Sequence, residues 1–211
     1  MRVSRCICIR RVNFGLFCIR IIRHAGKFEF SGTLVGFAII RHAVRSEVPR
    51  GCVNLQHEVE LGIVISKKAT DISENQAMDF VAGYVLALDM TARDFQNKAK
   101  EEGNPWIFAK GFDTSCPISK FIDKDKIADP HNLNLWCKVN GQMRQDGNTK
   151  DMMFKIPFII SYISSYFTLE PCDVVLTGTP KGVSGVKPGD KIECGLDNLV
   201  VMTYSVESNF M

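Results

Sequence analysis

The chain has 211 residues, of which 45% are hydrophobic and 23% charged, the balance of an ordinary globular protein with one buried core. A formal net charge of +3 is too small to indicate a nucleic-acid-binding protein, and the body of the chain has no basic patch interleaved with aromatic residues. Arg20 and Arg23 interrupt the most apolar stretch, so no run approaches the roughly 20 apolar residues of a membrane span. We therefore expect neither a nucleic acid nor a membrane as a partner.

Residues 1–50 form a basic leader. They contain ten Arg or Lys residues and only two Glu residues, which is a net charge of +8, whereas the remainder carries −5. Several arginines without an acidic residue before Glu29 are typical of a mitochondrial transit peptide. We expect either such a peptide, and with it a mitochondrial location, or an atypical, irregular start to the chain of a cytosolic protein.

Two apolar runs and one helical pattern open the body of the chain. The β-rich run 59–66 directly follows two acidic residues, and the run 80–88 ends at Asp89. The segment 91–100 has the pattern of a helix, which Gly103 ends. The sequence therefore predicts two strands and then a helix, with Asp89 opening the helix.

The second half begins with a strong hairpin signal. Asn140 and Gly141 form the dipeptide preferred in type I′ turns, because both central residues of that turn need a positive φ. A helix over 150–165, a strand over 173–176 and further strands over 190–206 follow. The fold class is therefore mainly β with helices (α+β), without the regular alternation of a doubly wound sheet.

Two carboxylates lie at the start of the first predicted strand. Glu58 and Glu60 are two residues apart, so on a strand both side chains project from one face. Two acids on one face repel each other unless a cation lies between them, and Mg²⁺ or Mn²⁺ prefers such oxygen ligands. The alternative is an ordinary solvated strand edge.

Asp89 adds a third acid at the end of a strand. On a helix that begins there, Arg93 and Gln96 follow at i+4 and i+7, on the same face as Asp89. That face is suited to a substrate carboxylate beside a metal. An Asp–Arg pair on a solvated helix explains the same spacing.

Lys110 and Thr179 complete the candidate residues. Lys110 lies in the apolar segment 105–113, where an ammonium group must meet an anion or extend to water. Thr179 belongs to the tight turn 177–180, which offers hydroxyl groups and backbone N–H groups to a carboxylate. A surface lysine and a plain structural turn are the alternatives.

From about residue 56 to its end, the sequence resembles the fumarylacetoacetate hydrolase family. Five motifs in order carry the resemblance: HEVELG (57–62), LDMTARDFQ (88–96), GNPWIFAKGFDTSCP (103–117), KVNG (138–141) and TGTPKGV (177–183). The second and third are most similar to the mitochondrial acylpyruvase and oxaloacetate decarboxylase branch. The resemblance covers roughly 155 residues and makes 51–211 the expected catalytic domain.

The resemblance implies a mixed β-roll fold, a homodimer, and a lid contributed by the N-terminal part. It implies one Mg²⁺ ion, with Mn²⁺ as the alternative, and a small 2-oxo acid as substrate. It assigns the metal to Glu58, Glu60 and Asp89, the substrate to Arg93, Gln96, Lys110 and Thr179, and a catalytic role to Lys110.

The implied reactions are hydrolysis of acylpyruvates to pyruvate and a carboxylic acid, and decarboxylation of oxaloacetate, both through an enolate. Hydrolysis needs a general base, which family hydrolases take from a His–Glu pair on the lid. His24 and His42 are the only upstream histidines, and neither has a glutamate at the H-x-x-E spacing. Two other hypotheses therefore stay open: a member that binds metal and a 2-oxo acid without turnover, and a metal-free structural β protein.

Overall fold

The computed structural model describes residues 5–9, 19–23, 29–30 and 33–34 as backbone and 45–208 in full. The strands are β1 (Arg5–Ile9), β2 (Ile19–Arg23), β3 (Glu29–Phe30), β4 (Thr33–Leu34), β5 (Arg45–Val48), β6 (Leu55–His57), β7 (Val59–Ile65), β8 (Val81–Leu88), β9 (Thr91–Ala92), β10 (Ile122–Asp123), β11 (Asn134–Val139), β12 (Gln142–Asn148), β13 (Val174–Leu176), β14 (Ser184–Val186), β15 (Lys191–Leu196) and β16 (Val200–Ser208). The helices are α1 (Glu74–Ala77), α2 (Arg93–Glu102), α3 (Ile107–Lys110) and α4 (Ile156–Ser164), with 3₁₀ turns η1 (Met78–Phe80), η2 (Lys124–Lys126) and η3 (Thr149–Asp151).

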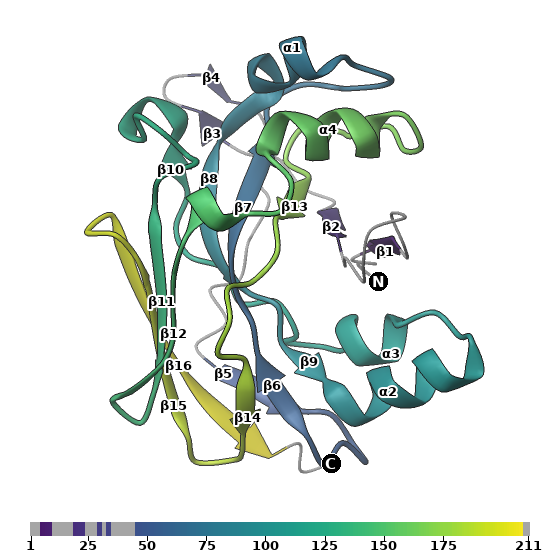
Figure 1. Cartoon of the computed structure of the whole chain (residues 1–211), viewed down its shortest axis with the longest axis vertical. Helices are drawn as coiled ribbons and strands as arrows, with labels where there is room; N and C mark the ends of the chain where they lie inside the picture. The colour runs from purple at the N-terminus through teal and green to yellow at the C-terminus, as the bar shows by residue number, and fades with distance from the viewer. Residues whose placement is uncertain (1–4, 10–18, 24–28, 31–32, 35–44, 209–211) are drawn as a thin grey trace.

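Two sheets form the frame of the molecule (Figure 1). One has the strand order β1-β2-β13-β7-β8-β10, and the other has the order β12-β11-β15-β16-β5. A smaller sheet, β14-β6-β9, lies below β7 in the view of Figure 1. The main hydrophobic core joins apolar side chains from β7 and β8 to those from β11, β15, β16 and α4. The expected α+β class with predominant β structure is thus confirmed.

The central strand β7 is buried on both faces. Its odd-numbered residues from Val59 to Ile65 belong to the main core, whereas Val64 belongs to a second cluster on the opposite face. Gly62 faces that second cluster closely, since a Cβ added there would lie 2.7 Å from the side chain of Val85. Burial on both faces explains why the sequence of β7 is a nearly continuous apolar run. The close approach of the Val85 side chain explains why residue 62 is glycine.

The leader contributes strands to both large sheets. β5 pairs in parallel with β16, and β2 pairs antiparallel with β13. The expectation of an irregular start is therefore wrong for these segments, because their pairing partners lie more than 150 residues away and local sequence carries no sign of them. Residues 24–28 and 35–44 of the leader, which include His24 and His42, lie outside the described residues.

The predicted hairpin is confirmed, as β11 and β12 pair around Asn140 and Gly141, whose φ values are 51° and 78°. The helix predicted over 150–165 is shorter at its start. Residues 149–151 form η3, and α4 begins only at Ile156, with Pro157 in its first turn. Its apolar face packs into the core through Ile156 and three further isoleucines.

Gly141→Ala is expected to lower the free energy of unfolding by about 1 kcal/mol. Nothing lies within 4 Å of a Cβ added there, so the cost is backbone strain at positive φ and not a clash. Urea denaturation measures the difference. In Gly185→Ala, the added Cβ meets nothing closer than 3.7 Å and φ is ordinary, so we expect no loss. An equal loss in both variants would contradict this explanation.

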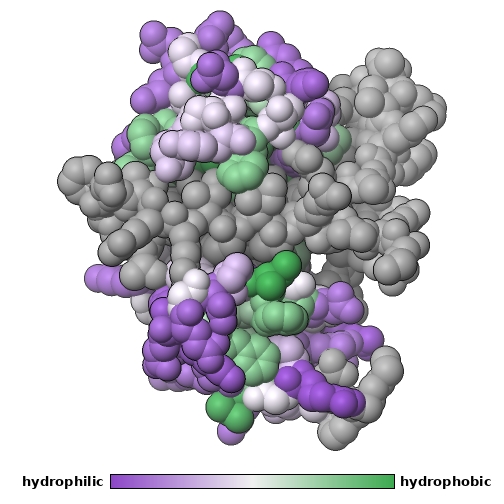
Figure 2. All heavy atoms as spheres, turned by 90° about the vertical axis from the view of Figure 1, so that its right-hand side faces the viewer, coloured by the Kyte–Doolittle hydropathy of each residue, from purple (hydrophilic) through white to green (hydrophobic). Residues whose placement is uncertain are grey.

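Figure 2 shows the face that carries α1 and α4 above and α2 and α3 below, where polar and apolar side chains are mixed. Exposed apolar side chains occur on α3, with Phe108, and just after α4, with Tyr166. Among the described residues, no helix has both the length and the apolar character needed to cross a membrane.

Candidate metal centre

The pairing of β7 with β8 brings three carboxylates together. Glu60 lies opposite Ala87, so continuing the antiparallel register by two residues places Glu58 opposite Asp89. The Asp89 N–H indeed donates to the Glu58 carbonyl over 2.8 Å. Since every second residue of a strand projects to the same side, all three side chains share one face. Their nearest carboxylate oxygens lie within 4.8 Å of one another, and all three residues are buried.

Asp89 does not open a helix as expected. Residues 91–92 instead form β9, which pairs with β6, and α2 begins only at Arg93. The prediction of one helical face through Asp89, Arg93 and Gln96 is therefore wrong, because a long-range strand pairing overrides the local helical pattern. Arg93 and Gln96 still meet, since an Nη1 hydrogen of Arg93 is donated to the Gln96 side-chain oxygen.

Two cationic groups surround the carboxylates. The Lys110 side chain is only 1% exposed, and its Nζ lies 2.8 Å from Glu58 Oε2 and 2.6 Å from Asp89 Oδ2. Arg93 pairs with the other oxygen of Glu58 and donates from Nε to Gln56 over 2.7 Å. The alternative of a surface lysine at position 110 is therefore excluded. These two cations balance part of the negative charge of the cluster.

Glu60 shows how strongly the cluster favours a cation. Burial raises the pKa of Glu60 well above its ordinary value of 4.5, and the neighbouring charges of Asp89 and Glu58 raise it further. Lys110 and the Gly178 N–H, which donates to Glu60 Oε2 over 2.7 Å, offset only part of this effect. The neighbouring positive groups thus do not fully balance three buried carboxylates, and a divalent ion that prefers oxygen ligands would supply the missing positive charge. The donor set therefore fits Mg²⁺ or Mn²⁺.

The raised pKa of Glu60 predicts a pH dependence with a definite sign. The metal-free folded protein holds a proton at Glu60 that the unfolded chain releases, so its free energy of unfolding falls as pH rises from 4.5 through the raised pKa. A cation must displace this proton, so Mg²⁺ affinity is expected to rise with pH in that range, by up to about tenfold per pH unit. Calorimetric titration of Mg²⁺ from about pH 5 to about pH 8 tests this. The dependence should disappear in Glu60→Gln, and an affinity independent of pH would contradict it.

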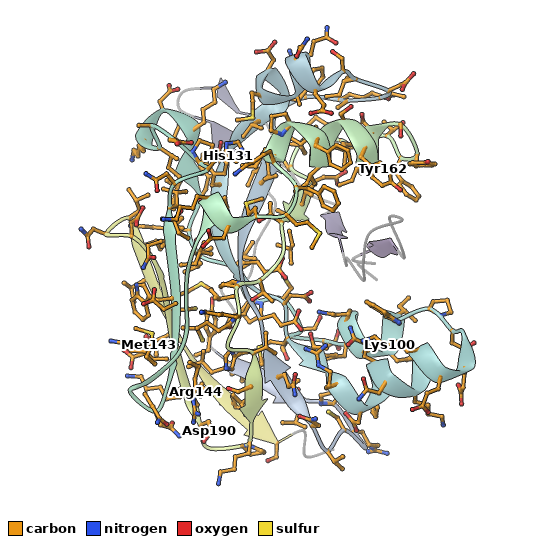
Figure 3. The ribbon with its side chains drawn as sticks, viewed as in Figure 1. Lys100, His131, Met143, Arg144, Tyr162 and Asp190 are labelled. Carbon is orange, nitrogen blue, oxygen red and sulfur yellow. The ribbon has the colours of Figure 1, made fainter. Side chains whose placement is uncertain are left out.

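Two of the carboxylates, Glu58 and Glu60, line a cavity of about 650 Å³. The predicted residues that line it are Glu58, Glu60, Arg93, Gln96, Lys110 and Thr179. Asp89 is not part of the lining, but it contacts the lining residue Lys110 over 2.6 Å. In the lower half of Figure 3, α2 lies on the right, where Lys100 is labelled, and β12 lies on the left, where Arg144 is labelled. Both elements supply side chains to the cavity wall. The structure thus brings together residues that span more than 120 positions of sequence.

Several wall residues were not predicted. Trp106 lies in the third motif, within the apolar segment 105–113, and Asp146 and Asn148 belong to β12, for which no site residue was expected. Gln145, buried beneath the Thr179 loop, also gave no signal. A buried glutamine on a polar strand cannot be recognised without knowing what packs over it.

Comparison with known proteins agrees with the geometry. The family model described as fumarylacetoacetate (FAA) hydrolase C-terminal matches residues 35–207. The mitochondrial oxaloacetate tautomerase FAHD1 of Homo sapiens is 56% identical over 154 residues, which is 73% of this chain and 70% of that protein. The mitochondrial oxaloacetate decarboxylase of Dictyostelium discoideum is 57% identical over 153 residues, or 72% and 70% of the two chains.

Solved structures share the fold. Fumarylpyruvate hydrolase from Pseudomonas aeruginosa, in complex with Mn²⁺ and pyruvate, superimposes with a TM-score of 0.76 at 33% identity, covering 79% of this chain and 72% of its own. A fumarylacetoacetate hydrolase family protein from Yersinia pestis gives 0.74 at 40% identity, with 77% of each chain covered. The expected fold is confirmed. The chain therefore belongs to the fumarylacetoacetate hydrolase family of enzymes.

Proposed function

We propose that this enzyme acts on small 2-oxo acids with a divalent cation, through an enolate: it tautomerises or decarboxylates oxaloacetate and hydrolyses acylpyruvates. The observation that carries the proposal is the convergence of Glu58, Glu60 and Asp89 with Lys110 and Arg93 beside the cavity. The oxaloacetate and fumarylpyruvate enzymes to which the chain is similar support this substrate class.

We assign the cation to Glu58, Glu60 and Asp89 and favour Mg²⁺ over Mn²⁺. When bound, it supplies a Lewis acid that draws electron density from the carboxylate and 2-oxo oxygens of the substrate. Glu58 and Glu60 line the cavity that would receive the substrate. The Mn²⁺ in the Pseudomonas aeruginosa relative supports a divalent metal of this kind.

The side chains of this protein position the substrate and balance its charge. Lys110 is held by two carboxylates, so its ammonium group is fixed beside the place where the enolate oxygen develops negative charge, and it acts as a catalytic residue. Arg93 and Gln96, joined to each other, orient the substrate carboxylate together with Thr179 on the opposite wall. A preorganised site of this type lowers the barrier by several kcal/mol.

In decarboxylation, the C3–C4 bond of oxaloacetate breaks and CO₂ leaves. The bonding electron pair remains on C3 and is delocalised onto the 2-oxo oxygen, and a proton taken up at C3 then gives pyruvate. Tautomerisation leaves the C3–C4 bond intact: a proton leaves C3, the electron pair is delocalised onto the 2-oxo oxygen of oxaloacetate itself, and a proton added to that oxygen gives the enol. In acylpyruvate hydrolysis, a water oxygen bonds to the acyl carbon before the same C–C bond breaks. Hydrolysis alone therefore requires an activated water.

The described part of the chain offers no histidine for that task. Both ring nitrogens of His57 are hydrogen-bonded, to Gln145 over 2.8 Å and to Ser184 over 2.9 Å. His131 accepts the N–H of Ile156 over 3.1 Å. Neither lines the cavity. We therefore expect oxaloacetate chemistry to be the stronger activity.

The test is pyruvate release from oxaloacetate and from acetylpyruvate, with Mg²⁺ or with chelator, and with Mg²⁺ alone as the background. Metal-dependent release from oxaloacetate well above that background supports the proposal. Release from oxaloacetate without hydrolysis of acetylpyruvate would restrict the enzyme to enolate chemistry. Stabilisation by Mg²⁺ without any turnover would instead favour a member that only binds metal and a 2-oxo acid.

We also propose a mitochondrial location and a homodimer. The basic leader and the mitochondrial relatives support the first. The second rests on family resemblance, and light scattering after size-exclusion chromatography measures the molecular mass that decides it.

A further inference from the structure

A row of buried polar side chains lies beneath the loop that carries Thr179. Gln145 on β12 and His57 at the end of β6 are both fully buried. Ser184 on β14 closes one end of the row, and Thr179 at the cavity wall closes the other. None of these groups except Thr179 has a part in the proposed chemistry, so their arrangement requires another explanation.

The directions of the hydrogen bonds to Gln145 follow from one backbone group. The Val59 N–H donates to Gln145 Oε1 over 3.1 Å, which identifies this atom as the amide oxygen. His57 Nδ1 therefore carries the proton that it donates to the same oxygen over 2.8 Å. The other ring nitrogen, Nε2, lies 2.9 Å from the Ser184 hydroxyl oxygen and is hydrogen-bonded to it. Held on both sides, the imidazole keeps the amide of Gln145 in one orientation.

In that orientation, both amide hydrogens of Gln145 point at the loop. Nε2 donates to Thr179 Oγ1 over 2.8 Å and to the Pro180 carbonyl over 2.8 Å. The Thr179 hydroxyl in turn donates to the Val59 carbonyl over 2.8 Å. The Thr179 side chain is therefore held between Gln145 on β12 and Val59 on β7, and Val59 directly precedes the metal-cluster residue Glu60.

The backbone of β12 also lies very close to the loop that carries Thr179. A Cβ added at Gly147 would lie 2.5 Å from Cβ of Pro180, and one added at Gly182 would lie 2.0 Å from the Arg144 carbonyl oxygen. The loop thus rests directly on β12, where Figure 3 marks Arg144 beside β14. Little room is left for Thr179 to shift unless the amide of Gln145 is lost.

We propose that Gln145, oriented by His57, is a positioning residue: it fixes Thr179, whose hydroxyl hydrogen is committed to the Val59 carbonyl, so that the backbone N–H of Thr179 meets the carboxylate of the substrate. The inference rests on the proposed function, because it assigns Thr179 to a 2-oxo acid. Under this proposal, two groups of residues have different roles in the site. Gln145 determines the affinity for the substrate, whereas the three carboxylates determine the affinity for the metal.

A double-mutant cycle tests this proposal with Gln145→Met, Thr179→Val and the combined variant. Each single change is expected to raise KM for oxaloacetate, and Kd for pyruvate in the presence of Mg²⁺, by roughly tenfold, about the worth of one hydrogen bond. In the combined variant, KM and Kd should rise no further than in the single variant with the larger increase, since both changes remove the same contact. The Kd for Mg²⁺ and kcat should stay within about twofold of wild type. Gln142→Met, an exposed glutamine on the same strand, is the matched control and should change nothing.

Effects that multiply to about 100-fold in the combined variant would overturn the proposal, because Gln145 would then act independently of Thr179. A weaker affinity for Mg²⁺ in Gln145→Met would also overturn it. Should that variant fail to fold, Gln145→Glu keeps the length and the Oε1 acceptor but, when ionised, cannot donate to Thr179, and it takes its place in the cycle. Wild-type protein that neither binds pyruvate with Mg²⁺ nor turns over oxaloacetate would overturn the proposed function and this inference with it.

Discussion

Replacing Asp89 with asparagine is expected to weaken Mg²⁺ binding at least about 100-fold, since loss of an outer-shell partner alone costs 10- to 100-fold. Asparagine has nearly the same shape but no charge, so the change removes one of the three carboxylates that we propose as metal ligands, which lie within 4.8 Å of one another, and should leave β8 intact. Metal-dependent turnover of oxaloacetate should fall by at least the same factor at low Mg²⁺ concentration. Calorimetry and the rate of pyruvate release measure the two effects.

Asp79→Asn is the matched control for this prediction. Asp79 precedes the other end of β8 and is exposed, and it lies outside the cavity. Its replacement should leave both Mg²⁺ affinity and turnover unchanged. Equal Mg²⁺ affinity in Asp89→Asn and wild type would show that these carboxylates do not hold the metal.

Lys110→Met is expected to affect stability and activity together. Lys110 contacts two buried carboxylates, and its removal leaves Glu58 with Arg93 alone and costs the metal-free protein about 3–5 kcal/mol in free energy of unfolding. Turnover with saturating Mg²⁺ should fall about 100-fold or more, because a fixed cation beside the developing enolate is lost. Urea denaturation with chelator and with Mg²⁺ separates the two effects, as the divalent ion should restore much of the stability and little of the rate.

Lys100→Met provides the control on the same cavity. Lys100 lines the wall but is exposed, and its Nζ lies 5.1 Å from the centroid of the Trp106 ring. Its replacement should cost less than about 1 kcal/mol and leave kcat unchanged. If Lys110→Met were as stable and as active as Lys100→Met, Lys110 would have no part in either role.

Much of the secondary structure was predictable because its causes are local. The apolar runs that became β7 and β8 carry β-branched residues, and Asn140-Gly141 selects its own turn geometry. Helix boundaries were less predictable. α2 begins two residues later than expected because residues 91–92 pair with β6, and α3 has only four residues, too short for a periodic pattern.

The sequence by itself determined which residue types are available for chemistry. The spacing of Glu58 and Glu60 and the position of Asp89 after an apolar run are properties of the chain alone, but they left a solvated strand edge open, and only the family resemblance assigned a metal to these three residues. Only the tertiary structure decided that Lys110 is buried against two of these acids and that Gln145 supports Thr179. Both contacts depend on strand register and on segments at least 21 positions apart, where the packing of the whole domain, and not local preference, selects the partner.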